Sequence, residues 1–192
     1  MLNELNSLQS RHLRRAWEAV ESAVAGMTEE QMNWAPKGKW SGANLIEHLS
    51  LGFSVTMKGC RMVLRQGGPE LLKPTWNQRW LAFRVIELGH FPMRVIAPRM
   101  VCPRGQSAEE ARRGLLANLI EMDQMMSKCE ERFGRSVQML AHPYLGPLTI
   151  PQWRKFSLFH VRRHMKQLQQ LRQQMAQESL ESSVSPAHIS PA

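Results

Sequence analysis

Four long segments of the sequence repeat apolar residues at every third or fourth position, and this pattern limits the fold more than any other feature. It is typical of amphipathic α-helices that bury one face. The segments run from Leu5 to Val24, from Ser41 to about Arg65, from Ser107 to Phe133 and from about Ile150 to Met175. Four such helices, with no convincing alternating strand, predict an all-α fold, and their simplest packing is a four-helix bundle. The 192 residues are 43% apolar, which is enough for one well-buried core.

The connection between the second and third helices is unusually long. We expect it to carry a short helix from Trp76 to Glu87 and then a proline-bearing segment from Phe91 to Pro103. Long connections of this kind are uncommon unless they serve a site. The loop from His142 to Leu148 leads to Thr149, which is predicted to cap the last helix, as Ser41 and Ser107 cap the two before it.

The composition changes after the last helix. Residues 1–177 are predicted to form one domain. Residues 178–192 are rich in Ser, Pro and Ala, which cannot support a core, so this segment is expected to be a disordered tail.

No segment is expected to cross a membrane or to direct secretion. The longest stretch without a charged residue, Ser136 to Trp153, contains three prolines and a glycine, which a spanning helix tolerates badly. Residues 1–6 hold an acid and two amides where a secretory signal has basic residues before an apolar run. The three cysteines, Cys60, Cys102 and Cys129, form no CxxC pair and are expected to be buried thiols. We therefore expect a cytoplasmic protein.

The chain is strongly basic, with 25 Lys and Arg against 16 Asp and Glu, a formal net charge of +9. No acid occurs between residues 132 and 177, and such a stretch can bind phosphates. It lacks interleaved exposed aromatic residues and any known nucleic-acid motif. We expect an ordinary basic surface, and nucleic acid is not the expected partner.

Two histidines lie in the middle of the apolar face of the last helix. The residues expected on that face are Trp153, Ser157, His160, His164, Leu168, Leu171 and Met175. Because His160 and His164 are four residues apart, their rings project from one side of the helix and can bind one metal ion. His48, expected on the inward face of the second helix, is the predicted third ligand. The alternative is a set of hydrogen-bonded core histidines.

Three neutral imidazoles suit zinc, nickel, iron or cobalt. The expected cofactor is a divalent ion, with zinc, nickel, iron and manganese as the candidates. Three imidazoles leave coordination positions for water or a substrate, which is the arrangement of a catalytic site rather than a closed structural one. Three titratable rings buried together would cost desolvation free energy unless something occupied the space between them.

Three separate segments carry a specific combination of motifs. They are Trp40-Ser41-Gly42-Ala43-Asn44-Leu45-Ile46-Glu47-His48-Leu49; His142-Pro143-Tyr144-Leu145-Gly146-Pro147-Leu148-Thr149 followed by Trp153; and His160-Val161-Arg162-Arg163-His164 followed by Gln167. Together they resemble the DinB-like (YfiT-like) superfamily of metal-binding four-helix bundles, and within it a branch described as a domain of unknown function. The resemblance extends from about Leu5 to Met175.

This resemblance implies that His48, His160 and His164 bind a divalent metal. Characterised relatives include thiol S-transferases, which use the metal to activate a low-molecular-weight thiol such as bacillithiol or mycothiol. Others are isomerases and hydrolases that use glutathione or mycothiol chemistry. The sequence departs from many relatives at Arg163, where they carry a further histidine. A fixed cation there would favour an anionic substrate or the carboxylates of a thiol cofactor.

Four residues are candidates to line or support the site. Gln167 lies three residues after His164 and can hold that ring through its second nitrogen, or it is an ordinary solvated glutamine. Arg163 is a candidate for the rim of the pocket. His142 and Tyr144 can close one end of the bundle, with His142 either a proton shuttle or a turn residue that bonds backbone groups. Glu47 points about 100° away from His48 and is expected to be a surface acid.

The residues and the resemblance together predict a divalent-metal-binding protein, and the resemblance implies thiol S-transfer to an electrophile as the leading reaction. A metal-dependent hydrolase is one alternative. A non-catalytic bundle that uses its basic surface to bind a partner is another, so the sequence leaves open whether the protein is an enzyme. A homodimer is also compatible with the exposed faces of a bundle.

Overall fold

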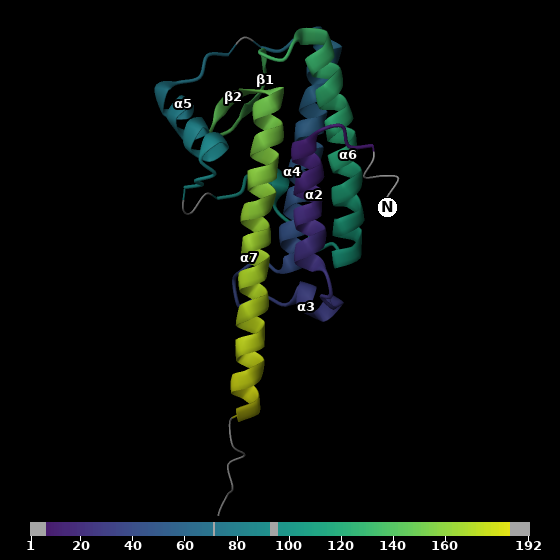
Figure 1. Cartoon of the computed structure of the whole chain (residues 1–192), viewed down its shortest axis with the longest axis vertical. Coiled ribbons are helices and arrows are strands. Elements are labelled where there is room, and N and C mark those ends of the chain that lie inside the picture. The colour runs from purple at the N-terminus through teal and green to yellow at the C-terminus, as the bar shows by residue number, and fades with distance from the viewer. Residues whose placement is uncertain (1–6, 71, 93–95, 185–192) are drawn as a thin grey trace, which may run out of the picture.

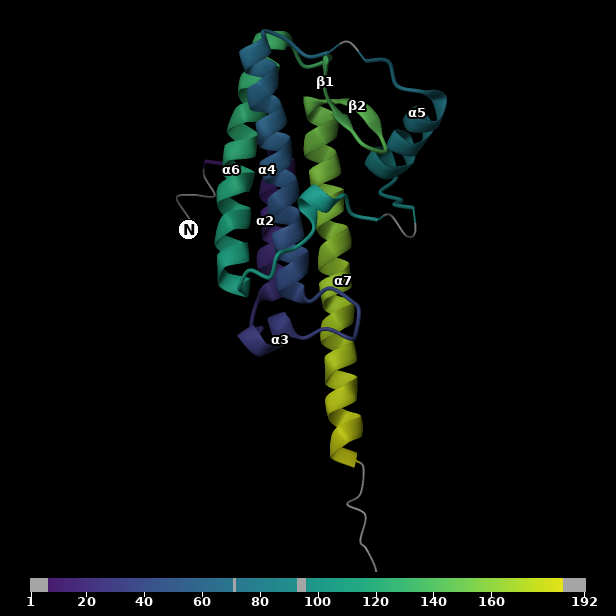
Figure 2. The same cartoon turned by 180° about the vertical axis from the view of Figure 1, so that it is seen from behind.

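The computed structural model describes residues 7–70, 72–92 and 96–184. Four long helices run along one axis, as Figure 1 and Figure 2 show: α2 (Arg11–Val24), α4 (Gly42–Gln66), α6 (Ala108–Phe133) and α7 (Ile150–Val184). A short helix, α3 (Glu29–Asn33), joins α2 to α4. The prediction of an all-α bundle with an elaborate connection between the second and third long helices is confirmed.

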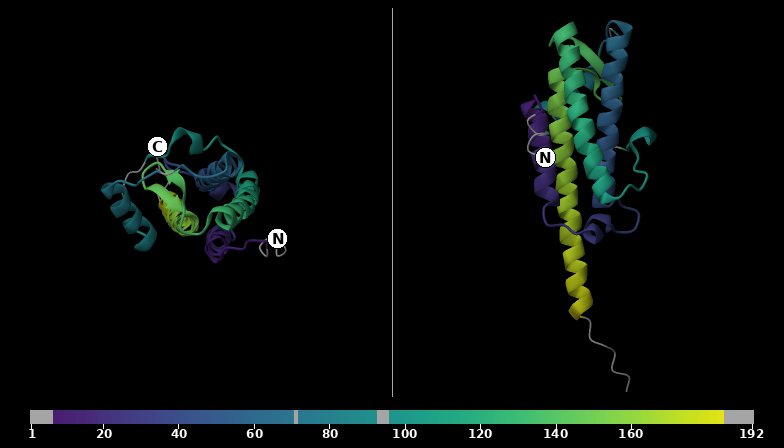
Figure 3. Two further views of the ribbon diagram at one scale, coloured as in Figure 1. Left: turned by 90° about the horizontal axis from the view of Figure 1, so that it is seen from above. Right: turned by 90° about the vertical axis from the view of Figure 1, so that its right-hand side faces the viewer.

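The bundle consists of two helix pairs. Helix α4 packs along α6, and α2 packs along α7, whereas α4 and α7 touch over a much shorter length. Figure 3 shows the four helices end-on. The largest fully buried side chains include Leu13 and Trp17 of α2, Ile46 and Leu49 of α4, and Leu115, Leu119, Met122 and Met126 of α6. The shared apolar core thus comes from faces with helical periodicity.

Polar caps fix where the helices begin. The Ser41 hydroxyl accepts from the Asn44 backbone N–H at the start of α4, and Ser107 does the same for Glu110 in α6. In return, the side chains of Asn44 and Glu110 accept the N–H of the capping residues. Thr149 caps α7 through the Gln152 backbone N–H. The three predicted caps are confirmed.

The first long helix begins later than expected. Residues 7–10 are not helical, and α2 starts at Arg11; Leu5 lies outside the described residues. The Ser10 backbone N–H donates to the Asp123 carboxylate of α6 at 2.8 Å, and Arg154 of α7 pairs with the same buried acid. This contact between distant elements holds Ser10 in an extended conformation. The spacing of apolar residues could not predict it, because it depends on a residue more than 100 positions away.

The predicted loop before the last helix is a short hairpin. Strand β1 (Gln138–His142) pairs antiparallel with β2 (Gly146–Thr149). The His142 ring nitrogen Nδ1 accepts the backbone N–H groups of Tyr144 and Leu145 in the turn. The Trp153 indole N–H also donates to the Leu140 carbonyl. The segment expected to be a loop is thus part of a hairpin that no alternating pattern in the sequence indicates, and this two-stranded sheet leaves the all-α class intact.

The last helix is longer than expected. Helix α7 continues to Val184, beyond the predicted end near Met175. Residues 178–184, the first part of the segment expected to be disordered, lie in this helix, while residues 185–192 lie outside the described part of the chain. The residues from 177 to 181 are exposed, so backbone hydrogen bonding extends the helix there without a buried face.

The connection between α4 and α6 packs beside α7 and the hairpin. It carries α5 (Trp76–Ala82), the π-helical turn η1 (Phe83–Glu87) and the 3₁₀ turn η2 (Arg99–Val101). The short helix predicted from Trp76 to Glu87 is confirmed, with a wider last turn. Trp76 and Trp80 project into solvent, being 85% and 62% exposed, whereas Val85 and Ile86 are buried against the bundle.

Glu47 holds this connection against α4. Its carboxylate accepts the backbone N–H groups of Arg104, Gly105 and Gln106 at 2.8, 3.0 and 3.1 Å. The side chain is fully buried. The expectation of a surface acid is therefore wrong. The Glu47 side chain does point away from His48, but it faces the returning chain at residues 104–106 rather than solvent.

We expect Glu47→Gln to lower the free energy of unfolding by about 2–3 kcal/mol. An amide accepts fewer hydrogen bonds than a carboxylate, and its NH₂ group would face the three backbone donors. Chemical denaturation followed by circular dichroism measures the change. The control is Glu131→Gln, an exposed acid on α6, which should stay within about 0.5 kcal/mol of the parent protein. Equal unfolding midpoints for the two variants would contradict this role of Glu47.

Candidate metal centre

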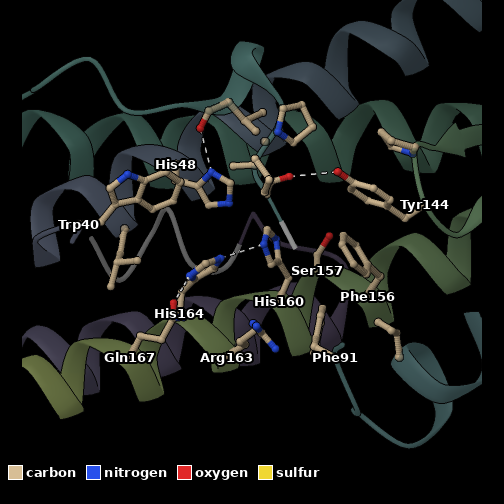
Figure 4. A pocket seen from close by; sticks show the side chains of 18 of the residues that line it. Trp40, His48, Phe91, Tyr144, Phe156, Ser157, His160, Arg163, His164 and Gln167 are labelled. Carbon is tan, nitrogen blue, oxygen red and sulfur yellow. Dashed lines mark hydrogen bonds between the residues drawn. The ribbon is translucent and has the colours of Figure 1, made fainter. Parts of the chain in front are cut away.

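Three histidines from two helices converge between α4 and α7. His48 comes from the second turn of α4, and His160 and His164 come from consecutive turns of α7. One ring nitrogen from each lies within 4.8 Å of the others, a grouping that could hold a metal ion. Figure 4 shows the three rings facing one another. The structure thus brings together the three residues that the sequence suggested.

Hydrogen bonds orient two of the rings. His48 Nδ1 lies 2.8 Å from the Val101 carbonyl oxygen of η2, and His164 Nδ1 lies 2.7 Å from Gln167 Oε1. Because both partners are acceptors, each Nδ1 carries the proton and each Nε2 keeps its lone pair. His164 Nε2 points at His160 Nε2, 2.9 Å away. These contacts select the tautomer that a metal ion needs from an Nε2 ligand.

The imidazoles are held neutral. Burial, and then the nearby His164 and His48, lower the pKa of His160 well below its ordinary value. Burial is also the main cause that lowers the pKa of His164 to about 4, and it lowers the pKa of His48. Neutral rings are the form that binds metals.

The spacing of the donor atoms fits a divalent ion. Ligand nitrogens around a tetrahedral zinc ion lie about 3.3 Å apart, given Zn–N distances of about 2.0–2.1 Å. His160 Nε2 and His164 Nε2 lie 2.9 Å apart, and all three donor nitrogens lie within 4.8 Å of one another, a range that includes this value.

The histidines open into a cavity of about 690 Å³. Most of its walls are apolar, from α4, α7, the hairpin and the connection. Aromatic rings surround the imidazoles: Trp40 lies 5.0 Å from His48, and Phe156 lies 5.3 Å from His160, between ring centroids. The cavity has the size of a site for a small organic molecule.

The other predicted residues also line this cavity, in different roles. Gln167 bonds the His164 ring, and the Arg163 guanidinium lies 5.2 Å above the centre of the Phe91 ring. The Tyr144 hydroxyl donates to the Ile96 carbonyl at 3.0 Å and so joins the hairpin to the connection. His142 lies beside Trp153 and Phe156.

His142 serves the turn of the hairpin. Its Nδ1 accepts two backbone N–H groups at 3.2 Å each, as the alternative to a proton shuttle predicted. Burial lowers the pKa of His142 to about 4. The ring is therefore neutral at pH 7 and carries no proton that it could readily donate to a substrate.

Sequence reasoning missed the partner of His48. Val101 contributes only its backbone carbonyl, and no residue type or spacing marks such a role. Phe91, which contacts Arg163 and lies 6.2 Å from His160, was likewise not singled out. The one available signal was the length of the connection that carries both residues.

A helical bundle with three convergent imidazoles in its interior is the class of protein that this fold and site define. Residues 12–168 match the family model of the DinB superfamily, and the chain belongs to this family. Searches among curated proteins and solved structures find no significant match. Among the described helices, none is both long and apolar enough to span a bilayer.

We expect Gln167→Ala to weaken metal binding about 10-fold or more, because the His164 ring would lose the partner that fixes its tautomer. Competition with a chromogenic chelator measures the affinity. Gln169→Ala is the matched control, since Gln169 lies two residues further along α7 and is exposed. Equal affinities for the two variants would show that the contact with Gln167 does not orient the ligand.

We also expect His142 to make the fold sensitive to acid. Its pKa is about 4 in the folded chain, against an ordinary value of 6.5 for histidine, so the unfolded chain binds the proton more readily. The stabilisation that neutral His142 gives to the folded chain is complete above pH 6.5 and is lost as the pH falls towards 4.

The variant His142→Asn tests this expectation, because asparagine keeps an acceptor for the turn but does not titrate. Between pH 7 and pH 5 the variant should lose about 1–2 kcal/mol less unfolding free energy than the parent protein. Parallel pH profiles from urea denaturation would contradict this.

Proposed function

We propose that the chain binds one divalent metal ion through His48, His160 and His164 and acts as a metal-dependent thiol S-transferase. The observation that carries the proposal is the convergence of three neutral imidazoles in a large apolar cavity. Membership of the DinB superfamily supports the same ligands. Zinc, nickel and iron accept imidazole nitrogen readily, and manganese is the fourth ion to test.

A divalent ion held by three imidazoles supplies Lewis acidity, which lowers the pKa of a thiol beside it from about 8.5 and so provides thiolate at neutral pH. A reaction that starts from such a thiolate needs no basic side chain. Low-molecular-weight thiols are kept reduced in the cytoplasm, so we expect the protein to work there.

The acid–base groups around the cavity favour thiol transfer over hydrolysis. A divalent ion can supply hydroxide as well as thiolate at neutral pH, but hydrolysis of an ester or amide also gains from a residue that gives a proton to the leaving group. Among the described residues that line the cavity, none is Asp or Glu. His142 bonds its own turn, and the Tyr144 hydroxyl donates to the Ile96 carbonyl. The residues therefore suit a reaction in which the nucleophile is the thiol itself.

In the proposed reaction the thiolate sulfur forms a bond to an electrophilic carbon of the second substrate. The bond from that carbon to its leaving group breaks, and the leaving group departs with the electron pair. The thiol proton passes to solvent, and no oxidant or reductant is consumed. Trp40, Phe91 and Phe156 surround the histidines and limit the access of water to the electrophile.

The test measures metal content and thiol transfer on the same untagged samples. We expect near-stoichiometric metal by inductively coupled plasma mass spectrometry, and conjugation of monochlorobimane with one of cysteine, glutathione, bacillithiol or mycothiol. His48→Ala, His160→Ala and His164→Ala should each lose the metal and at least about 100-fold in rate. Chelation should have the same effect, reversed by adding the ion back. His12→Ala is the control, because His12 is exposed on α2.

Three results would contradict the proposal. A parent protein that stays free of metal after incubation with these ions would leave the histidines as core residues. Metal-dependent hydrolysis of esters or amides without thiol transfer would identify a hydrolase. A metal that can be removed only with the loss of several kcal/mol of stability, in a protein without activity, would identify a structural site.

A further inference from the structure

The cavity is long and changes in character along α7. The α7 side chains that line it run from Trp153 and Phe156, through His160 and His164, to Gln167, Gln170 and Gln174. These 21 residue steps correspond to about 31 Å of helix. The histidines lie near the middle, with aromatic residues towards the hairpin and glutamines towards the other end. A molecule that fills the cavity would therefore be elongated and would reach past the histidines on both sides.

The charge in this cavity has only one sign. Lys39 and Arg163 are the ionised side chains among its described lining residues, and no acid balances them. Two other partly buried arginines, Arg112 and Arg154, pair with carboxylates. Arg163 instead lies against the face of Phe91, with no carboxylate in ion-pair range among the described residues. A partly desolvated guanidinium beside the histidines is thus left to bind an anion supplied by a ligand.

A glycine leaves room on the apolar side of the histidines. Gly52 lies one turn after His48 on α4 and lines the same cavity. A Cβ atom at Gly52 would meet no heavy atom within 4 Å. Phe53, Trp153 and Phe156 provide apolar walls around this end. Because glycine lowers the stability of a helix interior, this position costs stability and keeps the space open.

From these observations we propose that the substrate which meets the histidines is an amphipathic organic anion. Its carboxylate or sulfonate binds Arg163, and its apolar body fills the space beside Gly52 between Phe156 and Trp153. This inference rests on the proposed function only in taking the histidines as the reacting centre; the binding itself needs no metal. Figure 4 shows Arg163 and Phe91 on the same side of the histidines.

A pair of fluorescent probes tests the anionic requirement. Anilinonaphthalene sulfonate is an aromatic anion, and phenylnaphthylamine is its neutral analogue. We expect the anion to bind the parent protein about 10-fold more tightly than the neutral probe, and Arg163→Gln to remove this preference. Arg162→Gln is the matched control, because Arg162 is the neighbouring residue on α7 and is exposed. Equal binding of both probes, or equal effects of the two variants, would overturn the role of Arg163.

A second pair of variants tests the place of the apolar body. Gly52→Leu should fill the space and weaken both probes at least about 10-fold, with Gly52→Ala intermediate. The thermal midpoint should stay unchanged or rise, because a helical glycine is replaced. The double variant Trp76→Ala and Trp80→Ala removes the exposed aromatics of α5 and should leave binding unchanged. Loss of binding in that variant, or none in Gly52→Leu, would place the probes outside the cavity and overturn the inference.

Metal analysis of the same samples separates this inference from the proposed function. Gly52→Leu and Arg163→Gln should keep the metal content of the parent protein, because neither residue is a ligand. Probe binding that depends on Arg163 and Gly52 in a protein without metal would support the inference and contradict the proposed function. Bound metal with no selective binding of the anionic probe would do the reverse.

Discussion

Two neighbouring residues of α4 hold the connection that completes the site. The buried carboxylate of Glu47 binds three backbone N–H groups of residues 104–106, and the next side chain, His48, donates to the Val101 carbonyl. A buried carboxylate is tolerated only when its hydrogen bonds are made. The packing of α4 therefore depends on the connection, which supplies the three donors, and the connection depends on α4, which supplies the acceptor. The hydrogen bond from His48 Nδ1 to the Val101 carbonyl also fixes the tautomer of the His48 ring. The wall of the cavity and the orientation of one ring nitrogen of the histidine cluster therefore depend on how these two residues pack against the connection.

The electrostatics of the site form a consistent set. Burial keeps the imidazoles neutral, and Arg163 next to them further disfavours their protonated forms. No described residue lining the cavity brings a negative charge. Positive charge in the site then comes from Lys39 and Arg163, and from any metal that the three nitrogens hold. Such an interior disfavours cations and favours neutral or anionic molecules with apolar bodies, which agrees with the proposed use of a thiol and an amphipathic electrophile.

Much of the fold and the histidine cluster could be predicted from local pattern. Apolar spacing located the long helices, and Ser41, Ser107 and Thr149 were recognisable caps. The four-residue spacing of His160 and His164 put both rings on one helical face. Two predictions failed where contacts between distant residues decide the structure: Asp123 holds Ser10 outside the helix, and the returning chain buries Glu47. The hairpin was missed for a different reason, since its turn depends on local bonds of His142 and its strands lack an alternating pattern.

The sequence by itself determined the helical class, the inward direction of the two histidines on α7 and the excess of positive charge, because periodicity and residue type are local properties. Only the tertiary structure decided that His48 meets them, that the Val101 carbonyl orients the His48 ring, and that Arg163 and the space at Gly52 share one cavity with no acid among its described lining residues. These features depend on how two helices and a long connection pack. Packing brings together residues that are far apart in the chain. The hydrogen bonds of Glu47 and His48 to the connection use backbone atoms, which every residue carries, so no residue type in the sequence marks them.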